Sequence, residues 1–369
     1  MFFIWLAVVI TIGSAIFSAC KKEKPLATIQ EDKPNLDYSY DYESVLAFSP
    51  ASSGRVTNAG ARLGRVLFYD KKLSQNNTIS CASCHKQEFA FSDNTALSSG
   101  FNGEKTGRNS MTIVNAISSK GFFWDDRTKK LEDMVLQPVR HQVEMGLESS
   151  TFLIEKLNAT SYYPQLFNEA FGSPTITKEA VGKALAQFIY AMFTVNTRAD
   201  QSQVLFGGWN SNSPILTTDE KRGAFLFQNV GCAECHSGQN LRGWDDSGFE
   251  NIGLDSVYAD KGMGAISGNP AWDGVFKIPS LRNIELTAPY MHDGRFSTLE
   301  QVVEHYNSGV KYSPTLSYFL RKIDPVTYQP LPEALRLNLT ENDKRCLVAF
   351  LKTLTDYSLV SDKKFSNPF

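Results

Sequence analysis

The alternation of apolar and polar positions divides the chain into three parts. Residues 1–19 are almost wholly apolar and are followed by Cys20. Residues 21–50 are polar, include three prolines and show no helical period, which is typical of a flexible tether. From about residue 51, apolar positions recur at helical spacing between long loops rich in Gly, Asn and Ser. This pattern predicts a mostly α-helical globular region.

The clearest helical patterns lie late in each half of that region. One runs over 177–194, with Thr177 as the N-cap and Glu179 in the first turn, and the other runs over 340–355, with Thr340 as the N-cap. No alternating apolar run is long enough to predict a sheet core. The long loops are unusual for a compact domain unless they wrap a cofactor.

Each half also carries a Cys-x-x-Cys-His motif. The residues concerned are Cys81, Cys84 and His85 in the first motif, and Cys232, Cys235 and His236 in the second. In this pattern the two thiols add to the vinyl groups of a haem and the adjoining imidazole ligates the iron. A redox disulfide or half of a zinc site would need only the cysteines, so the histidine after each pair favours haem. Two covalently bound haem c groups are therefore predicted.

An internal repeat indicates how the halves are built. The segment that begins at Thr112 recurs from Ser280, an offset of 168 that also relates Asn115 to Asn283 (283 − 115). A short helical pattern also precedes both haem motifs, at 64–68 and at 223–227. We therefore expect two cytochrome c-like domains related by duplication, with long haem-wrapping loops, over 51–200 and 201–369.

The remaining cysteines and the net charge limit location and partners. The small residues before Cys20 are typical of a lipoprotein-type signal peptide over 1–20, followed by the tether over 21–50; an uncleaved membrane anchor is the alternative. Both interpretations export the protein, and the first anchors it by lipid at Cys20 on the periplasmic side. Cys346 lies in an apolar-periodic run and is interpreted as a buried structural thiol. A net charge of −2 argues against nucleic acid.

Further motifs carry a family resemblance. Two of them lie between the haem motifs: Trp-Asp-x-Arg at 124–127 and Val-Glu-Met-Gly at 143–146. A third, Thr-Ala-Pro-Tyr-Met-His-Asp-Gly-Arg, follows the second haem motif at 287–295. Over residues 54–355 the chain resembles the bacterial di-haem cytochrome c peroxidases, a superfamily that includes MauG-like enzymes. The resemblance implies reduction of hydrogen peroxide to water with electrons from cytochrome c or a similar small protein. A homodimer is compatible with it.

Residue by residue, the resemblance implies a division of labour. His85 would be the proximal ligand of a peroxidatic haem, and His236 that of an electron-transfer haem. Glu144 matches the distal acid, although a solvated surface carboxylate is the simpler alternative. Trp124 matches a tryptophan between the haems, a role compatible with a core aromatic. Asn109, with the backbone around Thr287 and Pro289, matches a calcium site.

The first haem site departs from the family pattern in two places. Phe101 occupies the position of a histidine that blocks the iron of resting peroxidases, so the first haem is expected to be open unless His141 swings in. Met134 occupies the position of a distal glutamine, for which Gln137 is the available substitute.

The second haem site also departs from the family pattern. Tyr306 stands where peroxidases have a methionine ligand, and MauG-like enzymes also have a tyrosine there. A phenolate stabilises ferric iron and lowers its potential. Met291 and His292 are rival ligands, and His305 lies on another helix face.

Three functions follow in order of preference. The first is a peroxidase, the second is a MauG-like oxidase that modifies a partner protein, and the third is a di-haem electron shuttle. Phe101 argues against the shuttle, because a shuttle needs strong ligands on both irons.

Overall fold

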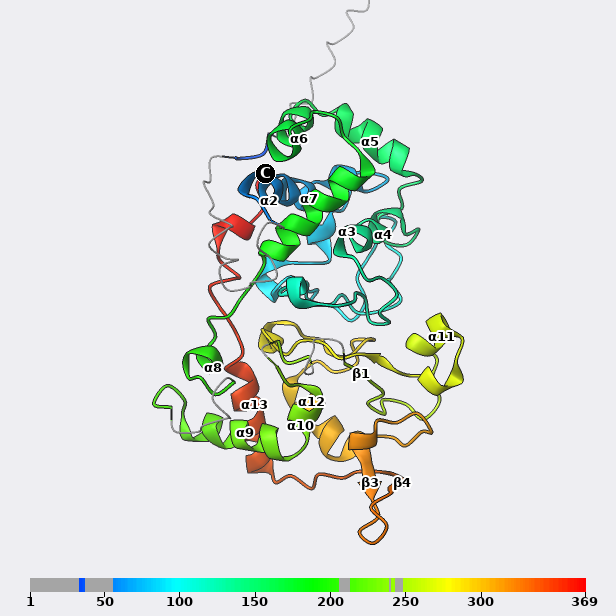
Figure 1. Ribbon diagram of the computed structural model, residues 1–369, viewed down its shortest axis with the longest axis vertical. Coiled ribbons are helices and arrows are strands. Elements are labelled where there is room, and N and C mark those ends of the chain that lie inside the picture. The colour runs from blue at the N-terminus through cyan, green and yellow to red at the C-terminus, as the bar shows by residue number, and fades with distance from the viewer. Residues whose placement is uncertain (1–32, 37–55, 206–212, 239, 243–247) are drawn as a thin grey trace, which may run out of the picture. The chain divides into compact units, whose positions relative to one another are not determined.

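The structure is a computed structural model that describes residues 33–36, 56–205, 213–238, 240–242 and 248–369 (Figure 1). The predicted signal peptide, the lipid anchor at Cys20 and almost all of the tether lie outside the described residues. Residues 34–369 form one compact unit. Within the described part, no helix combines the length and apolarity that crossing a membrane requires. The described chain is mostly helical with little sheet, as the sequence predicts.

The first half is a set of helices around one hydrophobic core. Its helices are α2 (Asn58–Tyr69), α3 (Leu131–Met134), α4 (Gln137–Arg140), α5 (Ser150–Asn158), α6 (Tyr163–Phe171) and α7 (Lys178–Ala191). Helices α2 and α7 pack against each other (Figure 1). The hydroxyl of Thr177 accepts a hydrogen bond from the amide of Ala180, which confirms the predicted N-cap of α7.

The second half has its own core and two small sheets. Its helices are α8 (Arg198–Gln201), α9 (Thr218–Asn229), α10 (Cys232–Cys235), α11 (Met263–Ser267), α12 (Leu299–Glu304) and α13 (Glu341–Lys352). Strand β1 (Phe249–Glu250) pairs antiparallel with β2 (Phe276–Lys277), and β3 (Arg321–Ile323) pairs antiparallel with β4 (Pro330–Ala334). The predicted N-cap Thr340 accepts a hydrogen bond from the amide of Asp343.

The main helix pair of each half crosses at a glycine. A Cβ atom on Gly64 of α2 would lie 2.0 Å from the carbonyl oxygen of Ala184 in α7. A Cβ atom on Gly223 of α9 would lie 1.9 Å from the carbonyl oxygen of Cys346 in α13. Both pairs therefore approach with their backbones in contact, which only glycine permits. This likeness supports the predicted duplication, which stays a prediction.

The end of the chain returns to the first half. Leu359 and Phe365 are buried in the same core as α2 and α7. The guanidinium Nε of Arg65 donates to the carbonyl of Ser366 at 2.6 Å, and the hydroxyl of Tyr69 donates to that of Phe365 at 2.7 Å. The predicted domain range 201–369 thus contains residues whose core partners lie within 51–200.

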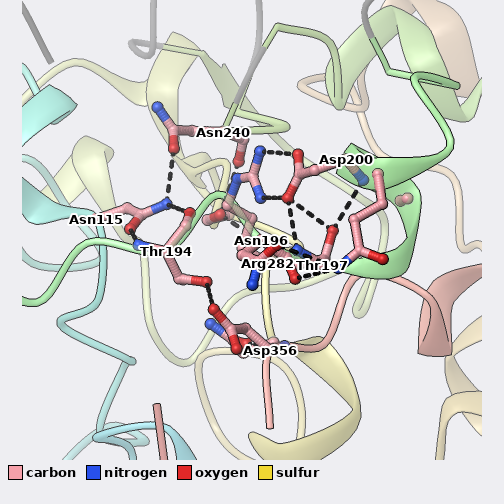
Figure 2. A network of polar contacts seen from close by, with 12 residues as sticks. Asn115, Thr194, Asn196, Thr197, Asp200, Asn240, Arg282 and Asp356 are labelled. Atoms are coloured by element: carbon pink, nitrogen blue, oxygen red, sulfur yellow. Dashed lines mark hydrogen bonds and ion pairs between the residues drawn. The ribbon is translucent and has the colours of Figure 1, made fainter. Parts of the chain in front are cut away.

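A buried polar network joins the two halves (Figure 2). The side-chain amide of Asn115 donates to Asn240 Oδ1 and to the carbonyl of Thr194, both at 3.0 Å. The hydroxyl of Thr194 in turn donates to Asp356 Oδ2 at 2.5 Å. Asn115 belongs to the first half and Asn240 to the second, so these bonds fix one half against the other.

The strongest contact in that network is a buried ion pair. Arg282 donates from both terminal nitrogens to the two oxygens of Asp200, each at 2.8 Å, and its side chain is only 1% exposed. The amide and hydroxyl of Thr197 also donate to Asp200. A bidentate guanidinium–carboxylate pair with further donors offsets the cost of burying both charges.

We predict that Asp200→Asn destabilises the fold by about 3–5 kcal/mol at neutral pH, because Arg282 would remain buried without its counter-charge. Burial alone would raise the pKa of Asp200, but Arg282 and Thr197 outweigh it and hold the pKa below its usual value. The stabilisation is therefore complete above a pH of about 4 and is lost as the pH falls toward the depressed pKa.

Denaturant unfolding of wild type and variant across this acid range checks the prediction. Glu333→Gln is the control, because Glu333 forms only an exposed pair with Lys322. A difference between wild type and Asp200→Asn that does not shrink at acid pH would contradict the assignment.

Candidate haem and peroxide site

A single cavity of about 900 Å³ contains both haem motifs. It is lined by residues of both halves, among them Cys81, Cys84, His85, Cys232, Cys235 and His236. The sequence placed these six residues in two motifs 151 positions apart (232 − 81). The fold brings them to one continuous space.

Both motif histidines are oriented in the same way. The Nδ1 atom of His85 lies 3.0 Å from the carbonyl oxygen of Phe91, and that of His236 lies 2.9 Å from the carbonyl oxygen of Leu241. Phe91 and Leu241 both have a positive φ, so each carbonyl is presented by a tight left-handed turn. A carbonyl bond at Nδ1 leaves Nε2 as the nitrogen that can ligate iron.

The ionisation of these groups suits haem c. Burial raises the pKa of Cys81, Cys232 and Cys235 to about 12. Burial also lowers the pKa of both His85 and His236, so the imidazoles are neutral and able to ligate. Paired thiols, neutral imidazoles and a large cavity fit two covalently bound haems.

Glu144 lies at the first haem motif. Its side chain lines the cavity and is 31% exposed. Burial raises its pKa, while the charges of His141 and Arg127 oppose that shift. The Nδ1 atom of His141 lies 3.5 Å from Glu144 Oε1. Burial thus makes this carboxyl easier to protonate than an exposed one, a property that suits a group that both donates and accepts a proton.

Phe101 packs behind this acid. Its amide donates to the carbonyl of Glu144 at 2.9 Å. A Cβ atom on Gly146 would lie 2.2 Å from its ring, so Phe101 occupies the space beside a glycine with φ of +70°. Among the described residues that line the cavity Phe101 does not occur, whereas His141, Met134 and Gln137 do. Gln137 donates to the hydroxyl of Thr128.

Trp124 lies in the wall that the two haem motifs share. Its indole nitrogen donates to the carbonyl of Asn109 at 2.9 Å, and its ring meets that of His292 edge-on at 6.4 Å. The side-chain amide of Asn109 donates to the carbonyls of Thr95 and Ala96. No cluster of three or more acidic, histidine or cysteine ligands occurs in the described residues. Calcium at Asn109 therefore stays a prediction.

The candidate sixth ligands of the second haem differ in their surroundings. Tyr306 lies on a π-helical turn, η8 (His305–Gly309), and lines the cavity. Burial raises its pKa, and Cys235 and Cys232 are close enough to add to the shift. Met291 also lines the cavity and has φ of +76°.

The two histidines nearby differ in their contacts. The ring of His292 stacks on Phe276 with a centroid distance of 4.0 Å. The Nε2 atom of His305 lies 2.9 Å from the carbonyl oxygen of Ile252. Tyr306, Met291 and His292 all line the cavity, whereas His305 does not occur among its described lining residues. The sixth ligand of the second haem stays a prediction.

The sequence does not predict the set of charged residues around residues 121–129, called the Trp124 loop below. Arg108 donates to both oxygens of Asp260, and also to Asp125 at 2.6 Å. Lys277 is buried in the same wall. Arg108, Asp260 and Lys277 belong to no recognisable motif. The contacts of Arg108 with Asp260 and of Lys277 with Gly121 join segments more than 150 positions apart.

This site defines a c-type redox protein with two haems in one chain. Glu144, Tyr306 and Met291 line the cavity that holds both motifs. The pattern of the family described as di-haem cytochrome c peroxidase matches residues 58–204. The chain belongs to this family, which confirms the resemblance seen in the sequence.

The relatives include proteins named as peroxidases and proteins named as MauG. The chain is 36% identical to a cytochrome c551 peroxidase of Nitrosomonas europaea over 66% of its own length and 71% of the relative's. It is 34% identical to the methylamine utilization protein MauG of Methylorubrum extorquens, over 79% and 77%. A crystal structure of a MauG-like protein associated with microbial copper homeostasis is 32% identical and covers 85% of this chain and 94% of that one, with a TM-score of 0.74.

We predict that the double substitution of Cys81 and Cys84 by Ala removes one covalent haem, and that the same change at Cys232 and Cys235 removes the other. The thiols are the attachment points, so denatured protein should retain one haem in each variant and two in wild type. Absorbance of the denatured protein and its intact mass measure the haem content.

Cys346→Ala is the matched control, because this thiol is buried outside the cavity, near Asp219. It should retain both haems. Extraction of haem from wild type by acidified acetone would overturn the assignment.

Proposed function

We propose that this protein reduces hydrogen peroxide to water at the haem of the first half, with electrons that enter at the haem of the second half from a cytochrome c or similar donor. The observation that carries the proposal is Glu144, a partly buried acid in the cavity of the first haem motif. The overall reaction consumes one peroxide, two electrons and two protons and yields two waters.

Glu144 is proposed to relay the proton that cleavage of the peroxide O–O bond requires. A bound haem supplies the iron that binds and reduces the peroxide. The carboxylate of Glu144 accepts the proton of the inner peroxide oxygen and returns it to the outer one, so that water leaves instead of hydroxide. The raised pKa supports this role, because a group that carries protons both ways needs a pKa near the working pH.

His85 and His236 are proposed to hold the two irons, each through Nε2. The carbonyls of Phe91 and Leu241 would hold the rings in that orientation. Trp124 lies in the cavity wall with its indole anchored to Asn109, a position that supports its proposed place in the electron path. Phe101 supports an accessible first haem, since phenylalanine offers no ligand.

Export to the periplasm, lipid attachment at Cys20 and a homodimer complete the proposal from the sequence. The first two follow from the small residues before Cys20, and covalent haem attachment outside the cytoplasm agrees with them.

We predict that Glu144→Gln keeps both haems and the fold but slows peroxide reduction by about 100-fold or more, because glutamine has no proton to relay. Stopped-flow mixing with peroxide measures the rate.

Glu148→Gln is the matched control, because Glu148 is exposed and lies four residues further along the same segment. It should turn over at the wild-type rate. Equal rates in wild type and Glu144→Gln would remove Glu144 from the mechanism.

A MauG-like activity is the second candidate, in which the electrons come from an amino-acid side chain of a partner protein. Tyr306 favours it, because the phenol lines the cavity of the second motif near Cys232 and Cys235. A phenolate ligand stabilises ferric iron and disfavours the reduced state that a peroxidase needs there.

We predict that Tyr306→Phe changes the resting absorption and electron paramagnetic resonance spectra of the second haem and raises its reduction potential, because the hard anionic ligand is lost. Tyr312→Phe, which removes a phenol outside the cavity lining, should change neither. A silent Tyr306→Phe variant, a methionine-type spectrum and rapid turnover with ferrocytochrome c would together assign Met291 as the ligand and discard the MauG-like candidate.

A further inference from the structure

Lys277 joins the second half of the chain to the Trp124 loop of the first. It lies on β2, and the residue is 7% exposed. Its amide donates to the carbonyl of Trp124 at 2.8 Å, and its Nζ atom donates to the carbonyl of Gly121 at 2.9 Å. One residue therefore holds both ends of the segment that carries the tryptophan.

That segment is restrained on its other sides too. The Trp124 indole is bound to Asn109, and Phe122 forms an isolated antiparallel bridge with Thr128. A Cβ atom on Gly121 would lie 1.4 Å from Asp126 Oδ1, so this position needs glycine. The Lys277 ammonium group is thus bound to a rigid loop.

Lys277 lines the same cavity as both haem motifs. The charged groups that face it are Arg242 on its own half, and Asp125, Asp126 and Lys129 on the Trp124 loop. Asp125 is held by Arg108 and Arg127, and Asp126 by Lys129. Among the described residues, no carboxylate lies within ion-pair distance of the Lys277 Nζ atom.

The result is a buried cation whose nearest acids are already paired with other residues. Burial, with a smaller contribution from the charge of Arg242, lowers the pKa of Lys277 to about 7, although Asp126 and Asp125 oppose the shift. Its charge therefore changes within the range in which the protein would work. Burial of a lysine without a close counter-ion is costly, so its presence in a cavity wall calls for a role.

We propose that Lys277 is a positioning residue for Trp124, and that the proton on its ammonium group controls electron passage between the two haem sites. The proposal rests on the proposed function only in taking Trp124 as part of the electron path. A positive charge in the wall stabilises an added electron nearby. An electron delivered by the donor would be accompanied by a proton that Lys277 takes up from solvent. The ammonium group would return this proton to solvent when the electron moves on.

The test is a spectroelectrochemical titration of both haems without peroxide, from about pH 6 to about pH 9. In wild type the reduction potential of at least one haem should fall as the pH rises through about 7, because the positive charge is lost. Lys277→Met should abolish that fall. Lys277→Arg, which stays charged, should keep the potential at its acid value throughout.

Lys322→Met is the matched control, since Lys322 is an exposed lysine paired with Glu333 on the β3–β4 hairpin. It should retain the wild-type pH dependence. An unchanged pH dependence in Lys277→Met, or none in wild type, would overturn the proposal. A purely structural role would lower stability in both Lys277 variants without selectively removing the pH dependence.

A second readout remains if Lys277→Met binds haem poorly. Because the pKa of Lys277 is lower in the folded than in the unfolded state, the unfolded state binds more protons between about pH 7 and about pH 10. Wild-type stability should therefore rise with pH across this window relative to Lys277→Arg, and equal slopes would overturn the proposal. If wild type fails to reduce peroxide, the proposed function is rejected. The potential titration and the stability measurement still test Lys277, because neither uses peroxide.

Discussion

The hydrogen bond from each motif imidazole to a backbone carbonyl is the constraint on which the site depends. It fixes which nitrogen of His85 and His236 faces the cavity, and it requires a left-handed turn five or six residues further on, at Leu241 or Phe91. The surrounding helices supply a rigid frame for these turns through backbone contacts at Gly64 and Gly223. Each proposed haem ligand is thus oriented by a local hydrogen bond, and helix packing supports the turn that provides the acceptor.

The space between the halves is organised by polar contacts. The buried Asn115–Asn240 bond joins the halves, and Arg108 links Asp125 to Asp260 across the cavity wall. The buried Asp200–Arg282 pair lies beside them within the second half. Polar contacts of this kind are directional, so they fix a relative orientation more precisely than apolar packing does. Precise orientation matters for a protein proposed to pass electrons between two sites.

The sequence predicted what depends on local pattern and failed to predict what depends on distant contact. The N-caps Thr177 and Thr340 and the helical class follow from short-range rules and are confirmed. The resemblance supplied Glu144 and Trp124, and both line the cavity. Lys277 and Arg282 carry no motif, because their partners lie far away in the chain and a lone charged residue usually indicates solvent. Tyr306 and Met291 lie on different segments of one cavity lining, so spacing along the chain does not choose between them.

The return of the C-terminal segment to the first core has a consequence for biogenesis. Leu359 and Phe365 complete a hydrophobic cluster whose other members are made hundreds of residues earlier. During synthesis or export from the N-terminus, the first half therefore emerges with an unfinished core and waits for the end of the chain. Because Cys81 packs against this core, we expect Cys81 and Cys84 to stay open to haem attachment until the C-terminal segment arrives.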